Sequence, residues 1–178
     1  MTDVNLFDLY RHARTSAFRL EVQQRYAVPA EETQFRIFLA DGVLPEVPAI
    51  EGSMAVIRAA TEAGTRIYRV HVVELPLTRY LRYELAAYSE NVRAGEEVRI
   101  TVRSRHADLA RLTQDFVLFD GETEQAAVVW MNYDEDGRIV SRDFSDTSSD
   151  IDRACRDRDL AMAHSVTLGE FAGSADVI

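Results

Sequence analysis

A strand, a helix and a second strand follow one another between Arg66 and Val102, and this order restricts the fold more than any other feature of the sequence. The run RIYRVHVVE, residues 66–74, is apolar on both faces, which is typical of a strand inside a sheet. Pro76 ends this run. A helix with apolar residues at helical spacing covers residues 77–93, and EEVRITV, residues 96–102, returns as a strand. This succession predicts two parallel strands joined by a right-handed crossover helix.

Further strands and helices are expected on both sides of this unit. The expected helices cover about residues 6–13, 29–42, 53–63 and 149–171, and the expected strands cover residues 17–28, 115–120, 125–133 and 138–144. The turn sequences DGETE and DEDG between the last three strands are typical of antiparallel hairpins. The sequence therefore predicts a mixed α/β fold: one mixed sheet of about five to six strands, with a β-α-β crossover, a C-terminal antiparallel meander and flanking helices.

We expect a single domain over residues 1–178, because 178 residues with 47% apolar content are sufficient for one packed core. Within it, residues 1–65 form an N-terminal helical and strand region, residues 66–145 the mixed-sheet core, and residues 146–178 a C-terminal helix and tail. No apolar run approaches the ~20 residues of a membrane helix, and the N-terminus MTDVNLFDLYRHAR lacks the basic then apolar order of an export signal. The expected location is the cytoplasm, without membrane contact.

All 20 basic residues are Arg, and the sequence contains no Lys. This composition excludes a Schiff-base lysine, a Ser-x-x-Lys dyad and a phosphate-loop lysine. The formal net charge is −10, although residues 66–111 are basic. An acidic protein repels a polyanion at long range, so we expect no direct binding of nucleic acid.

The helix predicted over residues 77–93 has three distinct faces. The apolar face is expected to pack on the sheet and contains Leu77, Leu81, Leu85, Tyr88 and Val92. The opposite face is expected to contact water and contains Arg79, Arg82, Ser89 and Arg93. A lateral stripe lies between them and contains Tyr80, Tyr83, Glu84, Ala87 and Asn91.

In this stripe, Glu84 is expected to lie half out of water beside phenol rings. A partly buried carboxylate needs a donor, and Arg69 or His71 on the preceding strand could supply it, with Arg99 and Arg103 on the next strand as alternatives. An open cluster would form a small polar pocket for an anion or an aromatic ligand. A closed cluster would be a structural ion pair, and we favour it because titratable clusters in sheets are more often structural. The residues predicted to bind a ligand or partner are Arg69, His71, Tyr80, Tyr83, Glu84 and Arg99.

One segment matches the spacing of a calcium-binding loop. NYDEDGRIVSRD, residues 132–143, could ligate Ca²⁺ through Asn132, Asp134, Asp136 and Asp143. That site requires a helix on each side, whereas both flanks here have the pattern of strands. We therefore favour a hairpin turn at DEDG. The four His residues show no metal-binding spacing, and neither a metal nor another cofactor is predicted.

Five runs carry a resemblance to a known family: FRLE (18–21), RVHVVELPLTRYLRYE (69–84), NVRAGEEVRI (91–100), DFVLFD (115–120) and NYDEDGR (132–138). Together they resemble an actinobacterial family of unknown function (DUF6879-like). The resemblance implies a cytoplasmic bacterial protein, encoded near helix-turn-helix regulators, with a regulatory or partner-binding role. At the level of the fold, the order of elements is also similar to half of a phospholipase D-like domain. Catalysis in that superfamily needs a His and a Lys in one motif, so the absence of Lys implies that this chemistry is absent here.

Two hypotheses of function remain open. The favoured one is a non-catalytic regulatory or interaction module that binds a protein partner, for example a helix-turn-helix transcriptional regulator, or a small ligand. The alternative is a small, metal-independent, hydrolase-like enzyme with His71 as general base and Glu84 or Asp115 as its orienting carboxylate. A homodimer is compatible with either hypothesis.

Overall fold

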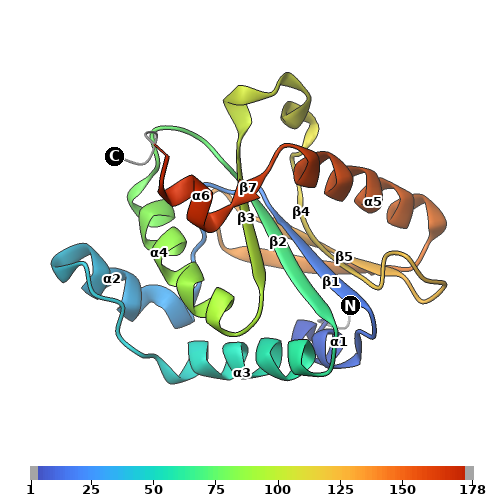
Figure 1. Cartoon of the computed structure of the whole chain (residues 1–178), viewed down its shortest axis with the longest axis horizontal. Coiled ribbons are helices and arrows are strands. Elements are labelled where there is room, and N and C mark those ends of the chain that lie inside the picture. Colours follow the sequence, from blue (N-terminus) through green and yellow to red (C-terminus); the bar gives the residue numbers. More distant parts are fainter. Residues whose placement is uncertain (1–3, 175–178) are drawn as a thin grey trace.

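A seven-stranded mixed sheet forms the centre of the protein, and the computed structural model describes residues 4–174 (Figure 1). The strand order is β6-β5-β4-β1-β2-β3-β7, with bounds β1 Ser16–Glu21, β2 Arg66–Val73, β3 Glu97–Val102, β4 Asp115–Phe119, β5 Ala127–Tyr133, β6 Ile139–Ser145 and β7 Val166–Thr167. Strands β1, β2 and β3 are parallel, and β4, β5 and β6 form an antiparallel meander. The predicted mixed α/β fold is confirmed, including the parallel crossover.

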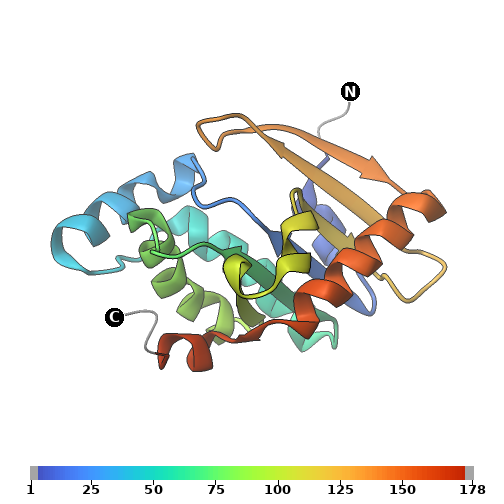
Figure 2. The same cartoon turned by 90° about the horizontal axis from the view of Figure 1, so that it is seen from above.

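Helices cover both faces of the sheet. Their bounds are α1 Leu6–His12, α2 Glu32–Asp41, α3 Pro48–Glu62, α4 Arg79–Arg93, α5 Ser148–Ala163 and α6 Leu168–Ala172. One face packs against α5 through a core that includes Leu20, Val70 and Phe116. The other face packs against α1, α3 and α4, and Figures 1 and 2 show α5 and these helices on opposite sides of the central strands. Among residues 4–174, no helix is long and apolar enough to span a bilayer.

The C-terminal segment differs from the single helix expected over residues 149–171. Helix α5 ends at Ala163, the chain then adds the two-residue strand β7 to the edge of β3, and α6 follows. Two side-chain contacts favour this break. Arg99 donates to the carbonyl oxygen of Ser165 at 2.7 Å, and Thr167 and Glu170 form a capping box that begins α6. The additional strand explains why the sheet has seven strands rather than five or six.

The crossover helix α4 has the predicted apolar and solvent faces, except that Val92 is exposed and the lateral stripe is buried. Leu81 and Tyr88 are buried on the sheet, whereas Val92 is 48% exposed and does not pack there. The stripe expected to lie half in water is buried, because the segment that leads into α2 covers it. Tyr83 donates to Gln34 Oε1 at 2.8 Å, and this hydrogen bond ties α4 to α2.

Strand β1 also differs from its predicted environment. In FRLE, Phe18 and Leu20 alternate with Arg19 and Glu21, a pattern typical of a half-buried strand. Because β1 lies between β4 and β2 and is covered on both faces, Glu21 is only 1% exposed. The α4 side of the two central strands therefore contains charged residues where a core normally contains apolar ones.

The start of β1 is held by Asp120, the residue that follows β4. Its φ of 49° is left-handed, which Asp and Asn tolerate better than most residues. Its carboxylate accepts hydrogen bonds from the backbone N–H groups of Arg14, Thr15 and Ser16 at 2.7–3.1 Å. Burial alone would raise the pKa of Asp120, but these N–H groups lower it below its usual range.

We expect Asp120→Asn to lower the free energy of unfolding by about 1–3 kcal/mol at pH 7, because Asn keeps the backbone conformation but loses the charged acceptor. A lowered native pKa gives stability that is present above about pH 4 and is lost as the pH falls through the native pKa. The cost of the substitution should therefore shrink at pH 3. Urea denaturation at both pH values measures it, with the exposed Asp146→Asn as control. An equal cost at both pH values would contradict the proposed role of the charge.

Candidate functional site

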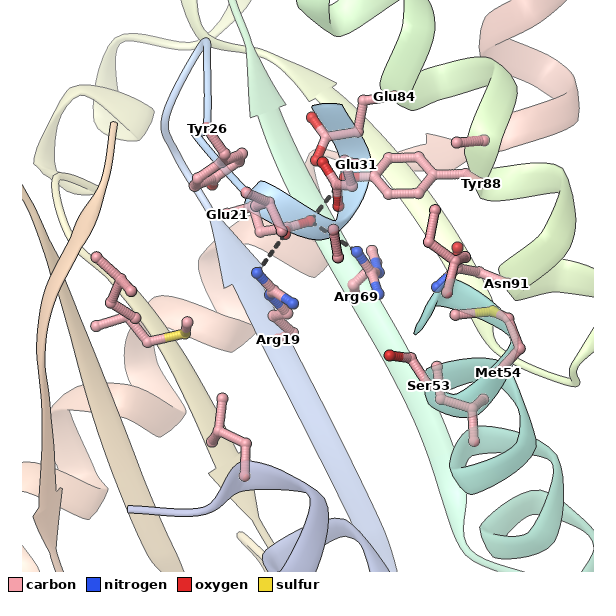
Figure 3. Close-up of a pocket in the computed structure, with 18 of the residues that line it drawn as sticks. Arg19, Glu21, Tyr26, Glu31, Ser53, Met54, Arg69, Glu84, Tyr88 and Asn91 are labelled. Atoms are coloured by element: carbon pink, nitrogen blue, oxygen red, sulfur yellow. Dashed lines mark hydrogen bonds and ion pairs between the residues drawn. The ribbon is translucent and has the colours of Figure 1, made fainter. Parts of the chain in front are cut away.

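A pocket of about 640 Å³ lies between the α4 side of the sheet and the helices that cover it (Figure 3). Its floor contains Arg19, Glu21 and Arg69 of the central strands. Its walls come from α1, α3, α4, the segment between β1 and α2, and the β5–β6 hairpin. Apolar side chains from α1, α3 and β5 line one end, whereas acids and tyrosines line the other.

The floor of the pocket is a buried ion-pair cluster. Arg69 donates to Glu21 Oε2 at 3.0 Å and to both carboxylate oxygens of Glu96 at 2.5 and 3.0 Å. Arg19 contacts Glu21 Oε1 at 2.8 Å, and Asn91 donates to Glu96 at 2.7 Å. Burial would raise the pKa of Glu21, but the charges of Arg19 and Arg69 lower it to about 2. The two Arg residues and the two Glu residues therefore neutralise one another.

His71 lies behind this floor and does not line the pocket. Its side chain is fully buried, and Nε2 lies 2.8 Å from the carbonyl oxygen of Gln23, which can only accept a hydrogen bond. Nδ1 lies 2.8 Å from the hydroxyl oxygen of Tyr88, which lies 2.7 Å from Glu21 Oε2 and has a single hydrogen for these two acceptors. Burial lowers the pKa of His71. A neutral imidazole whose Nε2 donates to Gln23 and whose Nδ1 lies against Tyr88 is a structural member of the cluster.

Glu84 extends from α4 towards the same cluster. Its Oε2 lies 3.5 Å from His71 Nδ1 but is buried and accepts no hydrogen bond from any residue within 4–174. Burial raises the pKa of Glu84 well above its usual range, and the negative charges of Glu21 and Glu31 raise it further. Glu31 accepts a hydrogen bond from Tyr80 at 2.8 Å, and burial raises its pKa as well. Glu31 and Glu84 thus lack the Arg partners that neutralise Glu21 and Glu96.

Asp115, the alternative orienting carboxylate, does not line the pocket and has other partners. It accepts a hydrogen bond from the backbone N–H of Val22 at 2.9 Å and from the hydroxyl group of Tyr26 at 2.5 Å. Burial raises the pKa of Asp115 to about 7. The structure brings His71 and Glu84 together but places Asp115 against Tyr26 instead of His71.

The ligand or partner residues predicted from the sequence separate into three groups. Arg69, Tyr80, Tyr83 and Glu84 line the pocket, and His71 lies behind it. Arg99 lies at the edge of the sheet, where Nε and Nη2 donate to Ser165, so the structure does not bring it to the pocket.

The favoured interpretation of a closed ion pair describes only part of this cluster. The Arg and Glu residues of the floor are fully paired with one another, but three of them, Arg19, Glu21 and Arg69, also line the pocket.

Three residues could offer metal ligands: atoms of Glu21, His71 and Glu84 lie within 4.8 Å of one another, the one such group among residues 4–174. The hydroxyl group of Tyr88 lies among them, at 2.7 Å from Glu21 Oε2 and 2.8 Å from His71 Nδ1. These distances place a phenol oxygen where a cation would bind. Arg19 and Arg69 also pair with Glu21 and would repel a cation there. The arrangement does not fit a metal centre.

The calcium-loop segment forms the hairpin between β5 and β6, as favoured from the sequence. Gly137 has φ 80° and donates to the carbonyl oxygen of Asp134, which closes the turn. Asn132 and Asp143 bond to each other across the two strands at 2.8 Å, and Asp136 pairs with Arg138. The flanking elements are strands, so these oxygens are not arranged as in a helix-loop-helix calcium site.

Several site residues were not predicted as such: Arg19, Glu21, Tyr26, Glu31, Asn91 and Glu96. The sequence did contain an indication for Arg19 and Glu21. Apolar residues surround them in β1 as they surround Arg69 and His71 in the central strand β2. Burial of β1 on both faces would have followed from that similarity.

Fold and site together define a mixed α/β domain with a charged pocket against the sheet. The chain belongs to the family described as "Domain of unknown function (DUF6879)", whose model matches residues 5–173. No curated protein matches it. Among solved structures it is similar to a phospholipase D family member, Nuc from Salmonella typhimurium, with a TM-score of 0.54 and 10% sequence identity over 91% of this chain and 87% of that chain. This finding confirms the expected similarity to a phospholipase D-like fold, and at this identity it concerns the fold alone.

We expect Asp115→Asn to raise the free energy of unfolding at pH 8 by about 1–3 kcal/mol. A carboxyl group whose native pKa is raised to about 7 gives stability that is present below its unfolded pKa of about 4 and is lost as the pH rises to 7. The amide keeps the shape without an ionisation cost. Urea denaturation at pH 4 and pH 8 should show the difference only at pH 8. A variant less stable than the wild type at pH 8 would contradict this account.

Proposed function

We propose that this domain binds a small molecule in the pocket and acts as a non-catalytic, regulatory ligand-binding module. One observation carries the proposal: Glu84 lines a pocket of about 640 Å³, and its buried carboxylate oxygen Oε2 has no hydrogen-bond partner within residues 4–174. An unpaired buried polar atom costs about 1–3 kcal/mol, which a ligand donor would recover. Pockets of this size are typical of small-molecule sites.

Burial favours a small ligand over a protein partner as the direct occupant of this site. The residues once expected to form a contact face, Tyr80, Tyr83 and Glu84, are each less than 9% exposed. A protein surface cannot reach them without displacing α2, whereas a small molecule can enter beside them. A protein partner that recognises the loaded domain, such as the helix-turn-helix regulator implied by the family resemblance, remains a separate part of the proposal.

The position of His71 argues against the enzyme alternative. A general base must come within hydrogen-bond reach of the substrate proton, directly or through one water. His71 is fully buried outside the pocket wall, and its two ring nitrogens contact Gln23 and Tyr88. The absence of Lys also removes the residue that holds phosphate in phospholipase D-like catalysis. These features support binding without turnover.

The test is the retention of a metabolite by the full chain. The protein is incubated with a small-molecule extract of its host, separated from unbound compounds and analysed by mass spectrometry. We expect one compound, or one chemically related group, to be retained and to remain chemically unchanged on long incubation. Retention of none, or its steady conversion to a product, would overturn the proposal.

Two Ala positions of α4 provide a matched pair of variants. Ala87 lines the pocket, and Ala87→Phe should fill part of it and reduce retention by about tenfold or more. Ala86 lies outside the pocket lining, one turn after Arg82 on the solvent face, and Ala86→Phe should retain the compound as the wild type does. Equal retention by both variants would show that the compound binds elsewhere and would contradict the assignment of this pocket.

A further inference from the structure

Acidic residues outnumber basic residues in the lining of the pocket, which disfavours an anionic ligand. Four Glu residues line it, at positions 21, 31, 84 and 90, against three Arg residues, at positions 19, 69 and 142. Glu96, behind the floor, adds a fifth acid, which pairs with Arg69. Since Glu21 and Glu96 neutralise Arg19 and Arg69, the floor has little charge left to offer an anion.

Three lining acids lie outside this neutral group, Glu31, Glu84 and Glu90, and the first two lie at the same end of the pocket. Glu31 enters from the segment before α2, and Glu84 enters from α4 (Figure 3). Tyr80 links the two acids. Its hydroxyl group donates to Glu31, and it lies one helical turn before Glu84 on α4. The ion pairs of residues 4–174 include no Arg that contacts either carboxylate within 4.0 Å. Two carboxylates in one partly dry site repel each other unless one of them is protonated or a cation lies between them.

Aromatic rings surround these two acids. Tyr80 packs against Tyr26 and Phe35, with ring centroids 6.1 and 5.5 Å apart, and against Tyr83 at 5.8 Å. Such rings present electron-rich faces that attract an organic cation, in addition to the acids. Towards the opposite end, the pocket is lined by apolar residues, including Leu6, Phe7, Met54, Ile57 and Ile139.

We infer that the ligand is an organic amine cation: its ammonium group lies between Glu31 and Glu84 beside the tyrosines, and its apolar body extends towards α1 and α3. This inference rests on the proposed function and names the chemical class of its ligand. An ammonium group supplies the hydrogen-bond donor that Glu84 Oε2 lacks, and its charge removes the repulsion between the two carboxylates. A carboxylate ligand would instead add a charge to the acidic end of the pocket.

Binding of a cation should be linked to release of a proton. Burial, with the negative charges of Glu21 and Glu31, keeps Glu84 protonated more readily than an ordinary Glu, and a bound ammonium group favours its ionised form. The ionisable groups near Glu84 are Arg19 and Glu21 of β1, Arg69 and His71 of β2, Glu31 before α2, and Tyr26, Tyr80 and Tyr88. Affinity should therefore rise with pH below the pKa of the amine itself.

The test compares three probes of nearly equal shape by isothermal titration calorimetry on the full chain: tryptamine, tryptophol and indole-3-propionate. They differ in a terminal ammonium, hydroxyl or carboxylate group. We expect tryptamine to bind at least about tenfold more tightly than either of the others, since only its ammonium group forms charge-assisted hydrogen bonds with the two carboxylates. Repeating the titration in buffers of different ionisation enthalpy should reveal proton release with tryptamine.

Substitutions of Glu31 and Glu84 test whether these two acids cause the preference for tryptamine. Glu84→Gln and Glu31→Gln should each reduce tryptamine affinity by about tenfold or more and leave tryptophol affinity nearly unchanged. Glu32→Gln removes the same charge from an exposed neighbour and should change tryptamine affinity by less than about fivefold. The urea midpoint of each variant checks that it folds, and Glu84→Gln should not be destabilised, because it removes an unpaired buried carboxylate.

The outcomes separate this inference from the proposed function. Tighter binding of tryptophol or indole-3-propionate, lost in Ala87→Phe, would overturn the amine class and keep the ligand pocket. Binding of none of the three at millimolar concentration, together with no retained metabolite, would overturn both. Equal tryptamine affinity in the wild type and in both Gln variants would overturn the placement of the ammonium group.

Discussion

The arrangement of the pocket depends on Arg69, a buried cation on the middle one of the three parallel strands of the sheet. From β2 it pairs with Glu21 on β1 and with Glu96 immediately before β3, so one side chain links three adjacent strands. Removing charges from water costs several kcal/mol per ion, and loss of one partner leaves an uncompensated buried charge, which costs about 3–5 kcal/mol. Such a cluster is stable only with every member in place. It therefore gives the pocket a rigid polar floor.

The pairing within the floor also affects the other acids of the pocket. Because the charges of the floor are satisfied internally, its Arg residues pair with Glu21 and Glu96 and not with Glu31 or Glu84. The same helix that buries Tyr88 against the floor also carries Glu84 into the wall. A residue of the ion-pair cluster and the residue proposed to bind the ligand thus lie on adjacent turns of α4.

The similarity to Nuc shows how far a fold can be separated from its chemistry. The two proteins share an architecture at 10% identity, but this chain has no Lys, and its buried His71 belongs to a structural network instead of facing the pocket. The face of the central strands is occupied by ion pairs that leave little room for a nucleophile. Function on such a scaffold depends on the side chains placed on it.

The amino-acid sequence by itself determined the order of elements, the parallel crossover, the antiparallel meander and the hairpin at DEDG, because hydrophobic periodicity and turn residues are local signals. It also indicated Glu84 and its tyrosines as a distinct stripe of α4. Only the tertiary structure decided that this stripe is buried and that Glu21 is the centre of an ion-pair cluster. The partners concerned are distant in sequence: Glu21 and Arg69 are 48 residues apart, and Gln34 and Tyr83 are 49 apart. Periodicity reports which side of an element is apolar, but which second layer covers the other side depends on the packing of remote segments.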